Sequence, residues 1–271
     1  MTHLERGNWA EWRLELDALP EYERNSKRMV ERSGLAGGFA RQIELTAGPS
    51  LDVPFASSEV IDIGCGYGHM TVELAKSCSK AVGIEPNETL AAAARENIHD
   101  QGLTNAHIRQ LTVEQLDDVE CFDLAIMDNV LEHIEDQVDA LWRLSRCLRI
   151  GGVAFILVPN KLWPIEVHYG LPFLSYLPLP MANWYLRASR RGSDYGDASY
   201  APTYRRLRKL LNARPELDSR LTLPADISLA EGGRSLVYRT GIVMINRFPQ
   251  LWAISKSFLV IAKKVATTPA N

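Results

Sequence analysis

Along positions 58–160, short apolar runs typical of strands alternate with segments in which apolar residues recur at helical spacing. Short apolar runs rich in β-branched residues predict strands buried on both faces, at 59–63, 80–84, 106–111, 122–127 and 153–158. Between these runs, apolar residues recur at helical spacing and predict helices at 68–77, between Asn87 and Gly102, at 114–116 and at 131–149. Strands that alternate with helices form a parallel sheet covered on both faces. The pattern therefore predicts an α/β fold with a mainly parallel, doubly wound sheet.

The two ends of the chain follow other patterns. Trp9 and Trp12 begin a helical pattern that ends at Pro20, and further helices are expected at 21–32 and near 39–45. These N-terminal helices either pack on the core or form a lid over the substrate. Towards the other end, we expect a helix at 203–211 and two more strands at 220–223 and 258–263. The sheet would then have seven strands.

Residues 159–202 interrupt the alternation after the fifth predicted strand and are rich in Pro, Trp, Tyr and Leu. The part at 167–186 has no charged residue, but its prolines would break a helix, so it is not a simple membrane span. We expect four parts: a helical lid at 1–50, a nucleotide-binding core at 51–160, a substrate cap inserted at 161–202, and the completion of the core at 203–271.

Three glycines, Gly64, Gly66 and Gly68, follow the first predicted strand at every second position. Glycine lets a backbone turn tightly and approach a ligand, because it has no Cβ. Glu85 ends the second predicted strand, 21 residues after Gly64 (85 − 64). An acidic residue at about this distance is placed to accept hydrogen bonds from ribose hydroxyls. A dinucleotide-binding G-x-G-x-x-G motif would put its third glycine at position 69, which is His69.

The run G-x-G-x-G from Gly64 to Gly68 resembles the first motif of the class I S-adenosylmethionine (SAM)-dependent methyltransferases. The resemblance is strong over residues 58–160 and weak towards the end of the chain. It implies SAM as the cofactor and a seven-stranded Rossmann-like methyltransferase fold, with N-terminal helices and an insertion after the fifth strand.

The resemblance also implies a set of cofactor-binding residues. These are Asp62, Gly64, Gly66 and Gly68 around the methionine part of SAM, Glu85 at the ribose, Pro86 at the adenine, and Asp128 and Asn129 beside the methyl group. Many members have Asp-Ala-Glu after the third strand, where this chain has Thr112-Val113-Glu114, so the backbone of Val113 would have to replace a side-chain contact to the adenine. Simpler explanations exist for two residues, since Glu85 can be a solvated strand end and Asp128 a helix N-cap.

Histidines are the candidates for proton transfer. Methyl transfer from a sulfonium is an in-line displacement, and a hydroxyl acceptor needs a base for its proton. His133 follows the fourth predicted strand, although it can equally be a helix-start residue bonded to the backbone, and His168 can reach in from the insertion. His69 is expected near the carboxylate of SAM. No H-x-x-E or cysteine spacing suggests ligands, so the sequence predicts no metal.

The aromatic residues of the insertion, among them Tyr169 and Trp184, are followed by Arg187, Arg190 and Arg191. Either they form the core of the cap with a solvated basic face, or they make a hydrophobic acceptor pocket or a surface that enters a bilayer beside anionic headgroups. The insertion is expected to select the acceptor, and a purely structural role of its aromatic residues is the alternative.

The composition bears on nucleic-acid binding, on the state of the cysteines and on the location of the protein. A net charge of −3 over 271 residues gives no basic footprint for nucleic acid. The four cysteines have no C-x-x-C spacing, and the N-terminus shows no apolar signal region, so reduced thiols and a cytoplasmic location are expected.

The sequence thus predicts a SAM-dependent methyltransferase that acts on a small or lipid-linked acceptor, at a hydroxyl oxygen, with possible membrane contact through the insertion. Two alternatives stay open, namely transfer to carbon or nitrogen, and a SAM-binding regulatory or scaffold protein without turnover. The chain lacks the Asn/Asp-Pro-Pro-Tyr/Phe run of enzymes that methylate amino groups of adenine or glutamine. The oligomeric state is left open.

Overall fold

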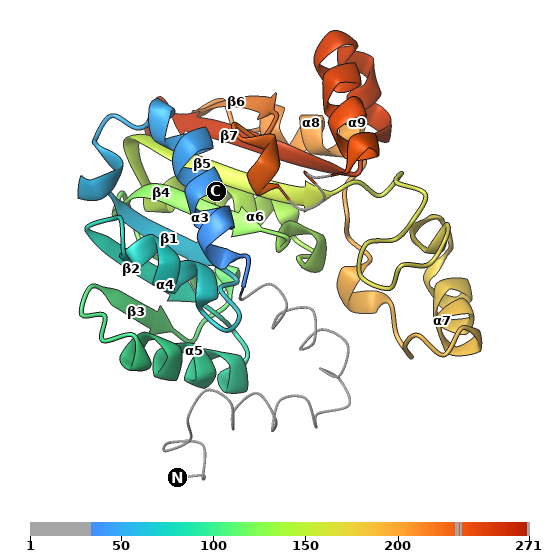
Figure 1. The fold of residues 1–271 in the computed structure, drawn as a ribbon, viewed down its shortest axis with the longest axis horizontal. Coiled ribbons are helices and arrows are strands. Elements are labelled where there is room, and N and C mark those ends of the chain that lie inside the picture. The colour runs from blue at the N-terminus through green and yellow to red at the C-terminus, as the bar shows by residue number, and fades with distance from the viewer. Residues whose placement is uncertain (1–33, 231–232, 234, 270–271) are drawn as a thin grey trace.

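The computed structural model describes residues 34–230, 233 and 235–269 (Figure 1). The helices expected at 1–20 and 21–32, with Trp9 and Trp12, lie outside these residues. The last of the expected N-terminal helices is α3 (Ala36–Ala47). It buries Ala40, Ile43 and Ala47 against the central sheet. The described part of the predicted lid is therefore packed on the core.

A seven-stranded sheet in the order β3-β2-β1-β4-β5-β7-β6 forms the centre of the fold. The first five strands pair in parallel, and β7 runs antiparallel to both β5 and β6. The strands are β1 (Glu59–Ile63), β2 (Lys80–Ile84), β3 (Ala106–Arg109), β4 (Phe122–Asp128), β5 (Leu148–Pro159), β6 (Leu217–Thr222) and β7 (Ser257–Lys264). This topology confirms the predicted α/β fold with a mainly parallel sheet.

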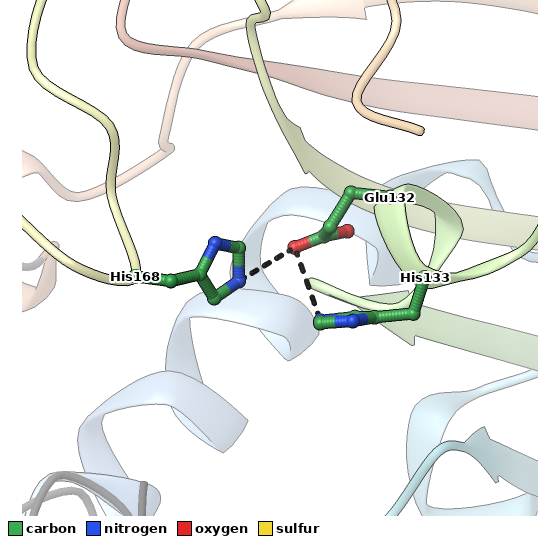
Figure 2. Close-up of side chains that lie close together, drawn as sticks. All are labelled: Glu132, His133 and His168. Carbon is green, nitrogen blue, oxygen red and sulfur yellow. Dashed lines mark ion pairs between the residues drawn. The ribbon is translucent and has the colours of Figure 1, made fainter. Parts of the chain in front are cut away.

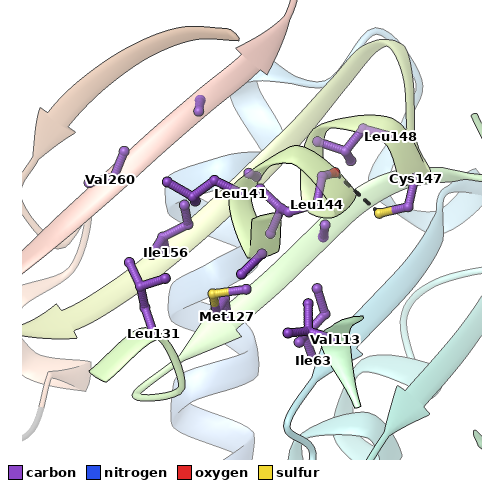
Figure 3. Packing of buried hydrophobic residues seen from close by; sticks show 14 of the residues in the cluster. Ile63, Val113, Met127, Leu131, Leu141, Leu144, Cys147, Leu148, Ile156 and Val260 are labelled. Carbon is purple, nitrogen blue, oxygen red and sulfur yellow. Dashed lines mark hydrogen bonds between the residues drawn. The ribbon is translucent and has the colours of Figure 1, made fainter. Parts of the chain in front are cut away.

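Helices cover both faces of the sheet, as predicted. On one face, α4 (His69–Ala75) and α5 (Glu88–Asp100) lie beside α3. On the other face, α6 (Gln137–Cys147) and α8 (Tyr204–Asn212) bury leucines against β1, β4, β5 and β7 (Figure 3). Successive residues of β4 point to opposite faces, so that Leu124 belongs to the first cluster and Ala125 to the second.

The single helix predicted at 131–149 is wrong at both ends. A 3-10 turn, η5 (Leu131–His133), comes first, and α6 begins only at Gln137. Asp136 caps α6, because its side chain accepts hydrogen bonds from the backbone N–H groups of Val138 and Asp139. At the other end the helix stops at Cys147, and β5 starts at Leu148. Leu148 and Arg149, which the periodic pattern assigned to the helix, therefore belong to β5.

The insertion forms a small layer of its own. It contains α7 (Leu179–Ala188) and two 3-10 turns, η6 (Leu174–Tyr176) and η7 (Gly196–Ala198). Figure 1 shows α7 set apart from the sheet. Six residues make its apolar core: Leu171, Leu174, Ala182, Leu186, Tyr195 and Ala198. Other apolar side chains stay exposed, and Trp184 has 67% of its surface accessible. Some apolar residues of the insertion thus form its core, as one expectation held, and others are exposed and available to form an acceptor pocket or a membrane surface, as the other held.

The segment between β6 and β7 contains α9 (Leu236–Arg247) and the 3-10 helix η9 (Pro249–Ile254), for which we had no sequence prediction. No residue of α9 is buried. Among the described residues, we find no helix with the length and apolar character needed to cross a bilayer.

Candidate active site

The three loop glycines adopt the left-handed backbone conformation, with φ values of 73° at Gly64, 53° at Gly66 and 71° at Gly68. Two of them also have no room for a side chain. A Cβ on Gly64 would lie 2.5 Å from Val130 Cγ2, and one on Gly68 would lie 2.9 Å from Ala94 Cβ. The loop that connects β1 to α4 therefore requires glycine for both its conformation and its packing.

Glu85 anchors this loop from the end of β2. Its Oε2 accepts a hydrogen bond of 3.0 Å from the Gly66 backbone N–H, and its Oε1 accepts one of 3.0 Å from the Asn87 N–H. The side chain is 7% exposed, which excludes the solvated strand end considered above. Burial raises the pKa of Glu85, and the two backbone hydrogen bonds oppose this. Since a carboxylate has about four acceptor sites, Glu85 keeps capacity for the two hydroxyls of a ribose.

Asp62 is the buried carboxylate of β1. It accepts a hydrogen bond of 2.7 Å from the hydroxyl of Thr71 at the start of α4. Burial raises the pKa of Asp62 to about 7; Thr71 lowers it, while Asp128 and Glu85 raise it further. Three carboxyl groups that influence one another here make a site suited to a cationic ligand.

Asp128 and Asn129 form the end of β4. Asn129 has a left-handed backbone with a φ of 55°, and its side-chain amide donates to Asp128 Oδ1 over 2.7 Å. The N-cap positions that follow are Val130 for η5 and Asp136 for α6. Asp128 is therefore not a helix N-cap, and that simpler explanation is wrong.

The remaining residues predicted to contact the cofactor, Pro86 and Val113, come after β2 and β3. Pro86 is exposed directly after Glu85, and Val113 is buried as the first residue of η4 (Val113–Gln115). The carboxyl ends of parallel strands meet at one edge of a sheet. The candidate residues that follow β1, β2, β3 and β4 thus lie along that edge, which fits an extended nucleotide.

His69 is the first residue of α4, and its Nδ1 lies 3.1 Å from the Asn97 side-chain nitrogen. Burial lowers the pKa of His69 to about 4, although Glu73 acts in the opposite direction. The imidazole is uncharged at neutral pH, so any contact with the carboxylate of SAM would be a hydrogen bond and not an ion pair.

His133 and His168 come together around a third residue, Glu132 (Figure 2). The ring centroids of the two histidines are 5.2 Å apart, in an edge-on arrangement. The Nε2 atom of His168 lies 3.7 Å from Glu132 Oε1, and that of His133 lies 4.0 Å from the same oxygen. Sequence reasoning treated the histidines as alternatives and missed Glu132. An acidic residue inside an apparent helix pattern gives no signal of burial, but η5 turns this side chain inward, where it is 0% exposed.

Each imidazole is held from its other nitrogen by a carboxylate of the insertion. His168 Nδ1 lies 2.7 Å from Glu166 Oε1, and His133 Nδ1 lies 3.0 Å from Asp197 Oδ2 and 3.1 Å from the Asp197 carbonyl oxygen. Burial would lower the pKa of His133, but Asp197 and Glu132 outweigh it and raise that pKa. Burial raises the pKa of Glu132 to about 7 against the effect of both histidines.

Asp128 connects the two parts of the site. Its charge raises the pKa of Asp62 beside the glycine loop and also that of Glu132. The histidine cluster therefore lies next to the end of β4, within electrostatic reach of the predicted cofactor residues. The sequence spacing had predicted no metal, yet the fold brings together three side chains of ligand type, one of them from the insertion.

Comparisons with known proteins agree with this geometry. Residues 61–156 match the family model of a methyltransferase domain. Ubiquinone biosynthesis O-methyltransferase of Methylococcus capsulatus is 34% identical over 108 residues, which are 39% of this chain and 45% of that protein. The protein of the same name from Mesorhizobium japonicum is 26% identical over 241 residues, 86% of this chain and 81% of that protein. The first match thus spans less than half of that relative.

The plantazolicin methyltransferase BpumL, solved in complex with SAH, has the same fold, with a TM-score of 0.57, 95% coverage of both chains and 14% identity. At this identity the likeness concerns the fold alone. The methyltransferase domain matched by residues 61–156, the sequence relatives and the fold agree with one another, and together they support the predicted class I SAM-dependent methyltransferase. SAM is the cofactor of this class, and the glycine loop with Glu85 fits it.

Proposed function

We propose that this protein transfers a methyl group from SAM to a hydroxyl oxygen of a small or lipid-linked acceptor. The observation that carries the proposal is the histidine cluster beside the end of β4, where His133 and His168 converge on Glu132. A site that can take a proton is what a hydroxyl acceptor needs. The name shared by these relatives, ubiquinone biosynthesis O-methyltransferase, supports oxygen as the acceptor atom and a lipid-linked acceptor.

The cofactor-binding roles follow the fold. In this proposal Asp62 and the loop glycines Gly64, Gly66 and Gly68 surround the methionine part of SAM, and Glu85 accepts from the ribose hydroxyls. Pro86 and the Val113 backbone border the adenine, and Asp128 and Asn129 line the methyl site. Bound SAM supplies an electrophilic methyl group on a positively charged sulfur. The buried carboxyls favour such a cation electrostatically.

The proton of the acceptor leaves through the histidine cluster. Glu166 and Asp197 hold the Nδ1 side of each imidazole, so the Nε2 side is directed towards Glu132 and the end of β4. In the simplest scheme His133 or His168 takes the hydroxyl proton directly as the oxygen attacks the methyl carbon. Glu132 then compensates the positive charge of the imidazolium.

The insertion at 161–202 selects the acceptor in this proposal, and the exposed apolar side chains of α7 touch a membrane surface. Met181 and Trp184 are exposed on α7, and Arg187 stands at its end. Apolar side chains beside arginines suit the interface of an anionic bilayer. A cytoplasmic protein with such a surface could collect a lipid-linked acceptor from the membrane.

The four parts of the chain divide the work accordingly. In this proposal residues 51–160 bind SAM, 203–271 complete the sheet, and the segment 1–50, which the sequence predicts to be a helical lid, closes the site against water. Water must be excluded because it competes with the acceptor and weakens the electrostatic interactions in the site.

Turnover with a panel of acceptors tests the function. We expect formation of SAH with phenolic or catecholic acceptors that carry an isoprenoid chain, and the same acceptors with the hydroxyl replaced by a methoxy group serve as controls. Methylated product from the blocked acceptors would indicate transfer to carbon. SAM binding without turnover on any acceptor would support the regulatory alternative.

A further inference from the structure

The cluster of Glu132, His133 and His168 has distances that hydrogen bonding does not explain. The two separations between Nε2 and Glu132 Oε1, 3.7 Å and 4.0 Å, exceed the length of an N–H···O bond. One ligand atom from each residue lies within 4.8 Å of the other two. Ligands about 2.1 Å from a shared cation stand roughly 3–3.5 Å apart. Small side-chain rotations would therefore bring all three atoms to one cation.

Glu132 is an unusual buried acid. It is 0% exposed, and neither of its carboxylate oxygens accepts a hydrogen bond from any described residue. A buried carboxylate is costly unless it is paired or coordinates a metal. The two imidazoles approach it at ion-pair distance, beyond the length of a hydrogen bond. The carboxylate of Glu132 is thus placed to contact a positive charge located between Glu132, His133 and His168.

The surroundings of the histidines also match those of metal ligands. A histidine that binds a metal through one nitrogen usually donates its other N–H to a carboxylate or a carbonyl group. Both histidines have this arrangement, His168 with Glu166 and His133 with Asp197. Glu166 is itself fixed by the backbone N–H groups of His168 and Tyr169, at 2.9 Å and 2.7 Å. With Nδ1 of each ring on these partners, Nε2 is the ring nitrogen on the Glu132 side.

We propose that Glu132, His133 and His168 bind one divalent cation of the Zn²⁺ type, which holds the hydroxyl oxygen of the acceptor at an open coordination position. Two imidazoles and one carboxylate suit Zn²⁺ and its borderline neighbours, whereas Mg²⁺ prefers an all-oxygen set. The inference deepens the proposed function and rests on it for the identity of the acceptor group.

The cation changes how the hydroxyl is activated. Coordination lowers the pKa of a bound hydroxyl, so the O–H bond breaks and its proton passes to solvent as the acceptor binds, before the site closes. A lone pair of the oxygen then forms the new O–C bond, while the C–S bond breaks and its electron pair goes to sulfur. The cation keeps its oxidation state. His168 belongs to the insertion, so the same cation would also fasten the cap to the core.

A matched control lies on the surface of α5. Glu96, His99 and Asp100 are the other described group with metal-ligand spacing, but His99 and Asp100 are exposed and lie on one helix end. The test uses the full chain, stripped with a chelator and titrated with Zn²⁺ by calorimetry and with Co²⁺ by visible absorption. We expect one ion per chain. Glu132→Gln and His168→Gln should weaken Zn²⁺ binding by more than 100-fold, and Asp197→Asn by about 10–100-fold. His99→Gln should leave it unchanged.

Unchanged SAM affinity in each variant shows that the variant is folded. The proposal is overturned if the stripped protein takes up no Zn²⁺ or Co²⁺, or if Glu132→Gln and His168→Gln bind as the parent does. Methyl transfer that persists undiminished in the metal-free protein would leave the proposed function standing and assign the proton to an imidazole. Metal binding at this site without turnover on any acceptor would leave the metal site standing and contradict the proposed function.

Discussion

His133 and His168 face each other across Glu132, with their ring centroids 5.2 Å apart, although one follows β4 in the core and the other belongs to the insertion. Asp197, also from the insertion, holds the core histidine. The cluster is therefore complete only when the insertion is folded against the core. Selection of the acceptor and activation of its hydroxyl would then depend on the same contact.

His133→Gln should lower the rate of methyl transfer by about 10²–10⁴-fold, the usual contribution of a positioned proton acceptor. Glutamine keeps hydrogen bonding but neither takes up a proton effectively nor replaces an imidazole ligand. SAM affinity, measured by calorimetry, should change little because His133 is not among the proposed cofactor contacts. Near-parental turnover across the pH range would mean that His133 only supports the structure.

Gly64→Ala should destabilise the protein and abolish SAM binding. The new Cβ would meet Val130 at 2.5 Å in a left-handed backbone conformation. Gly102→Ala is the matched control, since Gly102 has a φ of 63° and nothing within 4 Å of an added Cβ. The control should cost about 1–2 kcal/mol from backbone strain alone. Equal unfolding free energies for the two variants would contradict the steric argument.

Glu85→Ala should weaken SAM binding by about 1–3 kcal/mol, the value of a hydrogen bond to a charged group. The substitution also removes the acceptor for the Gly66 and Asn87 N–H groups. Glu85→Gln separates these effects, because its oxygen can still accept from one backbone N–H. Calorimetry that finds parental affinity in both variants would disprove the ribose contact.

SAM affinity should depend on pH through Asp62. Its pKa is raised to about 7 by burial, so the free protein holds this proton below pH 7. A cationic ligand favours the ionised carboxylate; hence affinity should rise with pH up to about 7 and then level off. Binding near pH 6.5 should release protons, which calorimetry in buffers of different ionisation enthalpy detects. The free protein should instead gain stability as pH falls from 7 towards 4, since the folded state binds this proton more tightly than the unfolded chain.

Asp62→Asn is the control for this pH dependence. It keeps the shape of the side chain and removes the titration, so the rise in affinity between pH 6 and 7 should disappear. An unchanged pH profile in this variant would assign the effect to another group, such as Glu85, whose pKa is also raised by burial.

Trp184→Ala should reduce the binding of the protein to vesicles with anionic headgroups and raise the KM for a lipid-linked acceptor. Its side chain is 67% exposed, so the unfolding free energy should change little. Leu174→Ala is the contrasting variant, because Leu174 is fully buried in the core of the insertion and its truncation should cost about 2–5 kcal/mol. Vesicle binding that is unaffected by Trp184→Ala would remove the membrane role from α7.

The sequence predicts the core well where local signals are strong. The predicted bounds of β1 and β2 coincide with the observed ones, because buried parallel strands show continuous β-branched runs that end in glycine or acidic residues. The apolar spacing from Leu131 to Leu144 continues through the turn at η5, so the pattern hides the break at Asp136. Element ends depend on caps that compete with periodicity.

The candidate site shows the same division. The glycine loop and Glu85 belong to one short motif, whereas the histidine cluster joins residues from η5, the loop at Glu166 and His168, and η7. No local pattern marks Glu132 or Asp197 as partners, because their roles arise from contacts between distant segments. The helix α9 contains many apolar residues between Leu236 and Ile245 that the sequence reasoning did not assign to a helix, and none of its residues is buried.

The antiparallel β7 has a consequence for how the chain reaches its native state. It pairs with the second half of β5, from Val153 to Pro159, with partners from Lys263 back to Ser257. During synthesis the ribosome releases β5 long before β7, and until then β5 presents an unpaired, strongly apolar border. Such a border is a template for association with other chains. The nascent protein therefore passes through a period in which its aggregation risk is concentrated at β5, and the arrival of β7 ends it.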